Sequence, residues 1–336
     1  MKKRPILYNA GLLLLIASAY WSSHGCRRGG GGGMARAADS SGQELPGPRA
    51  VAVDTRFELA RLRAGFETRI FSDTERWAAP RPPPELFELV HYAAPLGANA
   101  AYVTPPVEGT HRPALIWIAG GFDWNIGSWT PGPRENDQSA MTFHHPDLVL
   151  MKPSLRGSNE NPGRNECFLG EVDDVLSALA YLKSRADVDP DRIYLGGHST
   201  GATMALLVAA SSADFRAVFA FGPVSDPRNY GDISCLPPST EGLEARLRSP
   251  IEFVHEIRTP TFLIEGATAG NAVSCQQLMN RRGSAPLQFL KVAGGDHFNV
   301  IAPGSEVVLQ AILRDVGPEP KLDITVAAIA ERFAGQ

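Results

Sequence analysis

Ser199 stands in a short motif, Gly-His-Ser-Thr-Gly at residues 197–201, whose spacing is typical of an activated nucleophile. An apolar run at residues 193–195 precedes the motif, and an Ala/Leu/Met-rich segment of helical character follows it. The serine is therefore expected on a tight turn between a buried strand and a helix. Such a turn strains the serine backbone and pushes its hydroxyl out above the sheet, and the residues two before and two after must be small. The sequence predicts that Ser199 attacks a carbonyl carbon.

Two further motifs supply the other groups that this chemistry needs. His297, in Gly-Gly-Asp-His-Phe, follows the last expected strand at residues 287–292 and is predicted to be the general base. The backbone amide of Thr200 and an amide near Gly121 or Phe122, which follow the apolar run 114–118, are predicted to hold the oxyanion. This site needs no metal and no cofactor.

The remaining histidines carry weaker signals. His198 lies inside the serine motif, His255 lies in an expected helix, and His144 and His145 lie in a loop without further ligand-like spacing. We interpret them as structural or solvated rather than as metal ligands.

The elements around these motifs alternate between strand and helix. Strands are expected within residues 86–95, 99–106, 114–118, 147–151, 193–195, 215–221, 261–266 and 287–292, and helices at 171–185, after Ser199 and at 251–257. Continuous apolar runs such as 114–118 are typical of strands buried on both faces. The order predicts an α/β fold: a mainly parallel central sheet with helices on both faces.

At this point the chain resembles a known family. The segments LIWIAGG, SLRGSNENPG, GEVDDVLSALAYL, VDPDRIYLGGHSTG, FAFGPVSD, RTPTFLIEG and GGDHF, in this order over residues 86–315, are similar to the catalytic domain of the prolyl oligopeptidase family. The resemblance implies the α/β-hydrolase fold and a Ser-His-Asp site that cleaves peptides or esters. Peptidase members carry an N-terminal β-propeller that restricts access to short substrates. This chain has no room for one, so the family's protease specificity does not carry over.

The acid of the site departs from the family pattern. Members usually carry an Asp two to four residues beyond the Gly that ends the strand 261–266, but residues 266–273 contain no carboxylate. Three replacements are open. Glu265 at the strand end could turn in and is slightly favoured, Asp226 follows the preceding strand, and Asn271 could orient the imidazole without charge. Asp296, beside His297, is interpreted as a turn residue.

A second group of residues that match the family is polar. Arg156 and the acids Glu171, Asp173 and Asp174 near a helix start also match the family. Acids favour the positive end of the helix dipole, and Arg156 is their expected partner across the loop. We interpret the group as structural.

Residues 1–26 have the pattern of a targeting segment. Lys2, Lys3 and Arg4 precede a mostly apolar stretch at 6–21 that is short for a membrane span, and Ser-Ser-His-Gly-Cys26 resembles a lipoprotein cleavage site. Lipidation of Cys26, an uncleaved anchor and ordinary signal cleavage nearby all remain open. Each of them predicts a domain outside the cytoplasm, in a bacterial cell envelope.

The domain boundaries follow from composition. Residues 27–49 are rich in Gly, Ala, Ser, Arg and Pro and are predicted to be a flexible tether. Residues 50–85 are expected to be an N-terminal extension packed on the domain, and residues 86–336 the α/β-hydrolase domain. The net charge of −4, with 43% hydrophobic and 20% charged residues, is that of a globular protein, and nothing in it suggests a nucleic-acid surface.

Three cysteines remain beyond Cys26. In an oxidising compartment Cys167, Cys235 and Cys275 allow one disulfide and one free thiol. We expect Cys235 and Cys275 to pair, in loops at the strand ends that flank the site.

These observations support a serine hydrolase that acts on a small ester or a short peptide. The missing loop carboxylate supports an alternative, a catalytically inactive α/β-hydrolase-like domain retained for binding. Acyl transfer to an acceptor other than water would use the same residues. Segments 124–147 and 227–250 are expected near the substrate, and Trp124, Trp129, Phe143 and Tyr230 could line an apolar pocket or pack on the core.

Overall fold

The structure is a computed structural model that describes residue 42 and residues 44–73, 76–130 and 136–334. The targeting segment 1–26, including Cys26, and all but the end of the tether 27–49 lie outside these residues. Among the described residues, no helix combines the length and the apolar composition that crossing a membrane requires.

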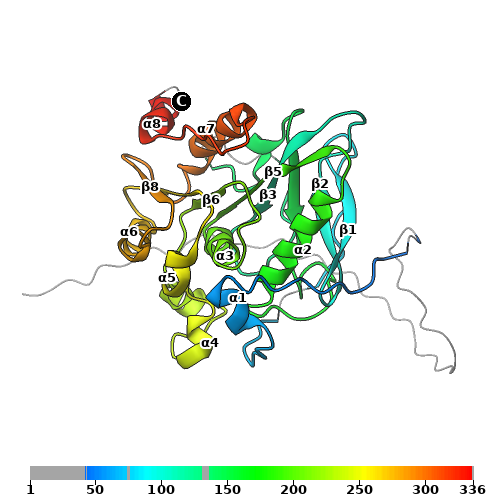
Figure 1. The fold of residues 1–336 in the computed structure, drawn as a ribbon, viewed down its shortest axis with the longest axis horizontal. Coiled ribbons are helices and arrows are strands. Elements are labelled where there is room, and N and C mark those ends of the chain that lie inside the picture. The colour runs from blue at the N-terminus through cyan, green and yellow to red at the C-terminus, as the bar shows by residue number, and fades with distance from the viewer. Residues whose placement is uncertain (1–41, 43, 74–75, 131–135, 335–336) are drawn as a thin grey trace, which may run out of the picture. The chain divides into compact units, whose positions relative to one another are not determined.

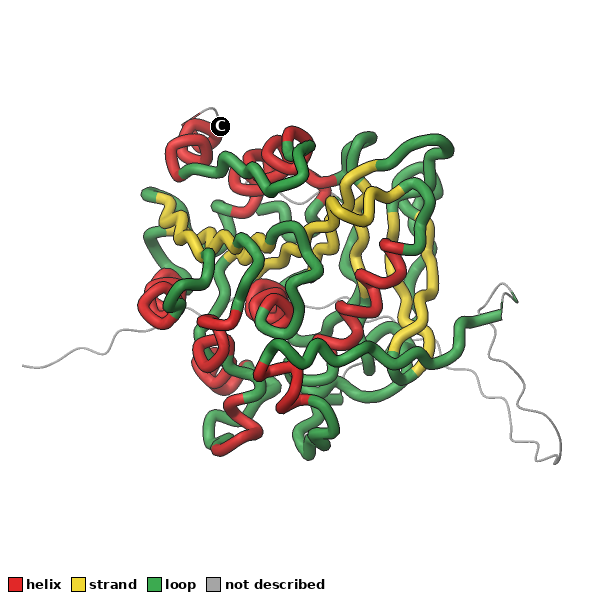
Figure 2. The backbone as a smooth tube through the Cα atoms, viewed as in Figure 1, coloured by secondary structure: helices red, strands yellow, loops and turns green. Residues whose placement is uncertain are grey.

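One eight-stranded sheet organises the described chain (Figures 1 and 2). Its strands are β1 (Glu88–Ala94), β2 (Gly97–Val103), β3 (Arg112–Ile118), β4 (Val149–Pro153), β5 (Val188–His198), β6 (Val218–Phe221), β7 (Thr261–Gly266) and β8 (Leu287–Val292). They run in the order β1-β2-β4-β3-β5-β6-β7-β8. Strands β4, β3, β5, β6, β7 and β8 are mutually parallel. Strand β2 is antiparallel to its neighbours β1 and β4. The predicted mainly parallel sheet is confirmed, and the carboxyl ends of its parallel strands meet along one edge.

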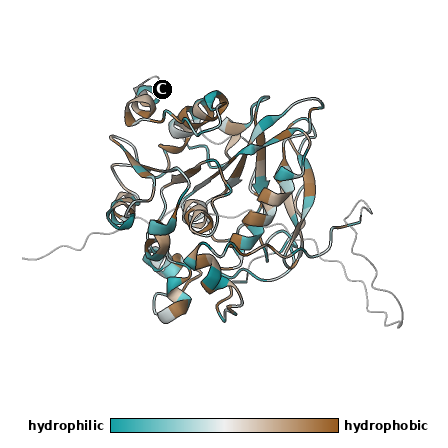
Figure 3. Ribbon diagram, in the orientation of Figure 1, coloured by the Kyte–Doolittle hydropathy of each residue, from teal (hydrophilic) through white to brown (hydrophobic). Residues whose placement is uncertain are grey.

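Helices cover both faces of the sheet. They are α1 (Glu58–Arg63), α2 (Glu171–Lys183), α3 (Thr200–Ala209), α4 (Gly242–Arg246), α5 (Pro250–Phe253), α6 (Ala272–Arg281), α7 (Ile301–Arg314) and α8 (Val326–Ala334). Strand β3 shows why two layers are needed: Ala114, Ile116 and Ile118 enter the core on the α2–α3 side, whereas Leu115 and Trp117 enter the core on the α7–α8 side. In Figure 3 brown, hydrophobic segments lie both on the strands and on the helices that cover them.

The segment before β1 packs against the sheet and the helices. Phe57 and Leu59 of the α1 region are fully buried. The amide of Glu58 donates a 2.7 Å hydrogen bond to the carboxylate of Glu256. Arg49, which we expected to end the tether, donates its amide to the carbonyl of Ala94 at 3.0 Å. The chain is therefore fixed to the edge strand β1 at the residue where we expected the tether to end.

Three details differ from the sequence expectations. The expected helix 251–257 is a short α5 followed by a 3₁₀ turn, Val254–Glu256. Cys275 lies in helix α6 rather than in a loop. Asp173 pairs with Arg63 of α1 at 3.0 Å and not with the expected Arg156, because its side chain leaves α2 toward α1.

Candidate active site

Ser199 lies at the junction of β5 and α3 in a strained conformation. Its φ of 55° and ψ of −115° are rare for a residue with a side chain. The turn is held by a hydrogen bond of 2.8 Å from the serine amide to the carbonyl of Phe221. A Cβ on Gly201 would lie 2.1 Å from the carbonyl oxygen of Ile118, and one on Gly197 would lie 2.6 Å from the Gly201 backbone. Strand and helix touch here, as the motif predicts, and only glycine fits.

The loop after β3 lies beside the serine. A Cβ built on Gly120 would lie 3.4 Å from the Cβ of Ser199, so the two turns are neighbours. Gly121 follows with a φ of 98°, and its carbonyl accepts a hydrogen bond from the Thr200 hydroxyl. The amide of Thr200 is the first of α3 and has no acceptor within the helix. The residues predicted to hold the oxyanion (Gly121, Phe122 and Thr200) thus come together around the serine.

His297 contacts a carboxylate through its ring. The Nδ1 atom of His297 lies 2.9 Å from Oε2 of Glu265, whose side chain is fully buried at the end of β7. The same oxygen accepts the amide of Asn271 at 2.9 Å, and Oε1 accepts the amide of Gly266 at 2.7 Å. Three N–H groups therefore converge on one buried carboxylate, which satisfies its charge in the absence of a cationic side chain.

Two glycines make room for this pair. A Cβ on Gly222, where φ is +63°, would lie 2.6 Å from the His297 ring and 2.7 Å from Oε2 of Glu265. A Cβ on Gly270 would lie 3.0 Å from the same carboxylate. The long side chain of Glu265 reaches the histidine because no other side chain occupies the space between them.

The two alternative partners for His297, Asp226 and Asn271, direct their side chains elsewhere. Asp226 caps the 3₁₀ segment Pro227–Ile233 and binds the guanidinium of Arg228, at 2.5 Å for the shortest contact. Asn271 directs its side-chain amide to the carbonyl of Gly222 at 2.8 Å. The Nδ1 atom of the base is instead engaged by Glu265. The expectation for Asp226 thus disagrees with the geometry, because this residue lies beyond the end of β6 and turns toward Arg228. Asp296 accepts two backbone amides and is a turn residue, as predicted.

His198 supports the loop that carries His297. Its Nε2 atom lies 3.0 Å from the carbonyl oxygen of His297, so Nε2 must carry the proton and donate it. Burial, reinforced by the nearby His297, lowers the pKa of His198 to about 3. The ring is therefore neutral at ordinary pH. We interpreted His198 as structural, but no sequence pattern indicated this bond to the base.

Tyr230 is a site residue that the sequence only grouped with other aromatics. Its hydroxyl lies 3.0 Å from that of Thr203 and within hydrogen-bonding reach of Ser199. Burial raises the pKa of Tyr230 above its ordinary value, and the bonds to Thr203 and Ser199 oppose that rise. Its ring meets the edge of Phe122, with ring centroids 5.2 Å apart.

The other three candidate pocket aromatics pack elsewhere. Trp124 packs edge-on against Phe168, and the fully buried Phe143 packs against Trp117. Trp129 packs edge-on against Tyr102. The alternative that these loop aromatics pack on the core therefore holds for Trp124, Phe143 and Trp129.

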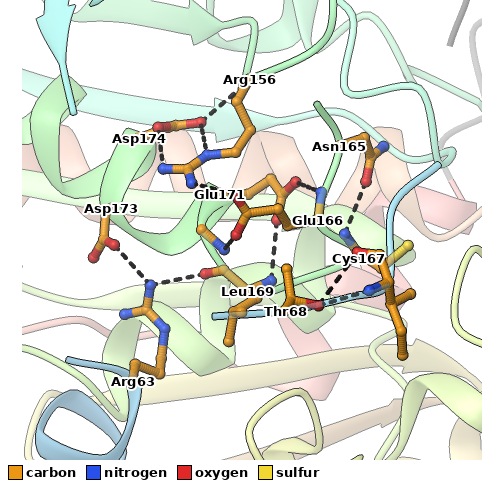
Figure 4. A network of polar contacts seen from close by, with 12 residues as sticks. Arg63, Thr68, Arg156, Asn165, Glu166, Cys167, Leu169, Glu171, Asp173 and Asp174 are labelled. Carbon is orange, nitrogen blue, oxygen red and sulfur yellow. Dashed lines mark hydrogen bonds and ion pairs between the residues drawn. The ribbon is translucent and has the colours of Figure 1, made fainter. Parts of the chain in front are cut away.

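A polar network supports the loop 154–170 (Figure 4). Arg156 binds both carboxylate oxygens of Asp174 and one oxygen of Glu166. Glu171 is fully buried and accepts the amides of Glu166 and Leu169, and burial raises its pKa to about 7. These contacts lie within the loop or between the loop and the first turn of α2, which agrees with the structural interpretation.

The expected disulfide disagrees with the structure. Cys167, Cys235 and Cys275 are free thiols. Cys275 is buried in α6, and Cys235 raises the pKa of Cys167 but is not among the causes of the raised pKa of Cys275. The error arose because a loop was assumed where α6 begins.

The order of the sheet and the strained serine between β5 and α3 define a protein of the α/β-hydrolase fold. The family model described as "Prolyl oligopeptidase family" matches residues 138–298. A relative, "Uncharacterized peptidase YtmA" of Bacillus subtilis, is 26% identical over 207 residues, which is 58% of this chain and 77% of the relative. Residues 138–298 therefore form a prolyl oligopeptidase family domain.

Solved structures share the fold. A puromycin-hydrolyzing peptidase of Mycobacterium tuberculosis superposes with a TM-score of 0.56 at 19% identity, covering 68% of this chain and 39% of that one. The acylaminoacyl peptidase of Pyrococcus horikoshii superposes with a TM-score of 0.54 at 16% identity, covering 73% and 44%. The chain thus spans about two fifths of the solved structures that it matches.

Proposed function

We propose that the chain is a serine hydrolase that cleaves peptide or ester bonds through an acyl-enzyme formed on Ser199. The observation that carries the proposal is the 2.9 Å contact between Nδ1 of His297 and the buried Glu265, at the same sheet edge as the strained serine. The prolyl oligopeptidase family domain at residues 138–298 supports a peptidase, and ester cleavage is the further activity that we include.

Each residue has a role in the proposed mechanism. The carboxylate of Glu265 accepts the Nδ1 proton of His297 and so leaves Nε2 free to take the proton of Ser199. The serine oxygen attacks the carbonyl carbon, and the amides of Thr200 and the Gly121–Phe122 loop bind the oxyanion. His297 then returns the proton to the leaving group, and water releases the acyl group by the same steps. No metal or cofactor takes part.

We propose short peptides and small esters as substrates. His297 is partly exposed, with 15% of its side chain accessible, and Ser199 is half-buried, so the groups are reachable from solvent. The described residues form one sheet with no propeller to sieve substrates by size. The names of the relatives, a puromycin-hydrolyzing and an acylaminoacyl peptidase, motivate trying blocked amino-acid amides first.

The alternative of an inactive binding domain rested on the missing loop carboxylate. Glu265 supplies a carboxylate from the strand instead, and it contacts the histidine. That contact favours the enzyme over the binding domain.

Fluorophosphonate labelling tests the proposal. The full chain should be labelled, and Ser199→Ala and His297→Ala should abolish labelling while each variant retains the wild-type melting temperature. A folded wild-type chain that is not labelled and turns over no member of an ester and peptide-amide panel would refute it. Labelling that persists in Ser199→Ala would place the nucleophile elsewhere.

We also propose attachment outside the cytoplasm, in a bacterial cell envelope, through residues 1–26. The basic start, the apolar stretch and Cys26 support this. Metabolic labelling with a clickable fatty acid should mark the wild-type chain expressed in bacteria and not Cys26→Ala. Equal labelling of both would exclude lipidation at this residue.

A further inference from the structure

Two thiols lie where two loops meet beside the candidate active site. Cys167 belongs to the loop 154–170 and is fully buried, and Cys235 belongs to the insertion 227–250 and is half-buried. Both are free in the structure. Cys167 is drawn among the network residues of Figure 4.

Contacts on either side of the cysteines hold the two loops together. The ring of Phe168, next to Cys167, stacks on the ring of Tyr230 with centroids 6.5 Å apart and planes 5° from parallel. On the other side, Nε of Arg248 donates a 3.3 Å hydrogen bond to the carbonyl of Glu166. The segments that carry the thiols are thus fixed against each other by contacts that do not depend on sulfur.

The two thiols are neighbours in the folded chain. The Cys235 side chain is the first cause of the raised pKa of Cys167, and burial is the second. Cys275, the third thiol, is buried in α6, and its raised pKa has burial and the charge of Glu265 as its main causes, with no thiol among them. A disulfide requires its two Cβ atoms about 4 Å apart, and the Phe168–Tyr230 stack and the Arg248–Glu166 bond hold the two segments close together.

We propose that Cys167 and Cys235 are a disulfide-forming pair that closes the insertion 227–250 onto the loop 154–170. A small-molecule disulfide, such as oxidised glutathione, is the oxidant. A thiolate of the more accessible Cys235 attacks it, forms a mixed disulfide and releases one glutathione thiol. The Cys167 thiolate then attacks the Cys235 sulfur and releases the second glutathione. Two protein thiols thus lose two electrons and two protons, and one oxidised glutathione becomes two reduced molecules.

The bond would tie the segment of Phe168 to the segment of Tyr230. It closes a loop of roughly 70 residues, long enough to remove substantial entropy from the unfolded chain. We expect oxidation to raise the melting temperature by about 5–10 °C. Because Tyr230 lies against Ser199, the tie would also fix one wall of the site, a consequence that rests on the proposed function.

Peptide mapping tests the pair without any activity assay. Trypsin places Cys167, Cys235 and Cys275 on separate peptides, 165–183, 229–246 and 259–281. The full chain is treated with oxidised glutathione, its free thiols are blocked under denaturing conditions, and it is digested without reduction. We expect peptide 165–183 linked to 229–246, with 259–281 blocked as a free thiol. A link between 229–246 and 259–281, or all three peptides blocked, would overturn the proposal.

Matched variants give a second readout. The difference in melting temperature between the oxidised and the reduced chain should disappear in Cys235→Ser and persist in Cys275→Ser. Cys235 is the better site to change because it is only half-buried, whereas a polar substitution at Cys167 would disturb the core. An oxidised-minus-reduced difference that survives in Cys235→Ser would contradict the assignment. Loss of catalysis in any of these variants would bear on the proposed function and not on the disulfide.

Discussion

Replacing Glu265 by Gln is the sharpest test of the site, because it removes a charge and keeps the side-chain volume. The carboxylate accepts N–H groups from Gly266, Asn271 and His297. A glutamine amide has one acceptor oxygen, so in either orientation it leaves one of the two backbone N–H groups facing its own NH₂. The variant thus loses the charge opposite the imidazolium and leaves a buried donor unpaired.

The magnitude follows from the 2.9 Å contact. With an effective dielectric constant of about 20, a unit charge at this distance stabilises the imidazolium of the transition state by ~6 kcal/mol. The Gly266 and Asn271 amides already neutralise part of that charge, so the net loss is smaller. At 1.36 kcal/mol for each factor of ten, we expect kcat/KM to fall roughly 10³- to 10⁴-fold. Replacing the acid of another serine protease costs a similar factor.

The assay is the rate of fluorophosphonate labelling together with kcat/KM on the best substrate of the panel. Asp226→Asn is the matched control: it also exchanges a carboxylate for an amide near the site, and it keeps an oxygen to cap the segment 227–233. It should stay within about threefold of wild type. Retained activity in Glu265→Gln with loss in Asp226→Asn would assign the acid to Asp226. Retention in both would show that His297 works without a carboxylate.

Three other substitutions probe the surroundings. Gly222→Ala should abolish labelling, because its Cβ would lie 2.6 Å from the ring of the base. Tyr230→Phe should slow labelling about tenfold with little change in KM, since it removes a hydroxyl beside Ser199 and keeps the ring. His198→Asn should remove a loss of folding stability at low pH. The pKa of His198 is about 3 in the folded state and 6.5 in the unfolded state. This histidine therefore stabilises the fold above pH 6.5 and ceases to do so as the pH falls toward 3. The free energy of unfolding of wild type, minus that of the variant, should therefore fall by ~1.4 kcal/mol per pH unit below pH 6.5 in urea titrations.

Each of these has its own control. Gly231 has the same φ of +63° as Gly222, but a Cβ built on it would meet nothing within 4 Å, so Gly231→Ala shares the backbone strain and not the collision. Equal effects of the two changes would remove the steric argument. For Tyr230→Phe, a rise in KM at constant kcat would indicate substrate binding rather than a role at the reacting atoms. For His198→Asn, a difference that does not vary with pH would mean that the histidine titrates alike in both states.

The sheet was readable from the sequence because its central strands are buried on both faces and leave continuous apolar runs, such as residues 114–118 and 261–266. Helix α7 was not predicted from the sequence. Pro303 and Gly304 stand in its first turns, and these residues ordinarily indicate a break in a helix. The structure explains the glycine: a Cβ there would lie 2.6 Å from the ring of Phe221. Packing against the sheet overrides the low helix propensity at that position.

The acid of the candidate site illustrates a different limit of prediction from the sequence. Glu265 lies at the end of β7 and Asp226 follows β6, both strands have their carboxyl ends at the site, and sequence order cannot separate the two residues. What separates them is that Gly222 and Gly270 have no side chains, which leaves the volume that the longer side chain of Glu265 occupies. The disulfide pair and Tyr230 were out of reach for the same reason. Which loop residues face each other depends on how two insertions fold over the sheet edge, and neither insertion has a periodic pattern.

The position of the acid can be moved, which gives a last prediction. Gly270 stands four residues beyond Gly266, at the place where relatives were expected to carry Asp, and a Cβ built on it would lie 3.0 Å from the Glu265 carboxylate. In the double variant Glu265→Ala/Gly270→Asp, the new carboxylate would enter the volume that the glutamate vacates and approach Nδ1 of His297. We expect it to recover at least tenfold in kcat/KM over Glu265→Ala alone. Gly270→Asp by itself should be less active than wild type, because two carboxylates would then compete for one small space. Glu265→Ala/Thr268→Asp is the control, since Thr268 bonds to the carbonyl of Gly295. If the two double variants are equally inactive, the space around His297 accepts a carboxylate only from the strand, and the geometric account of the acid is wrong.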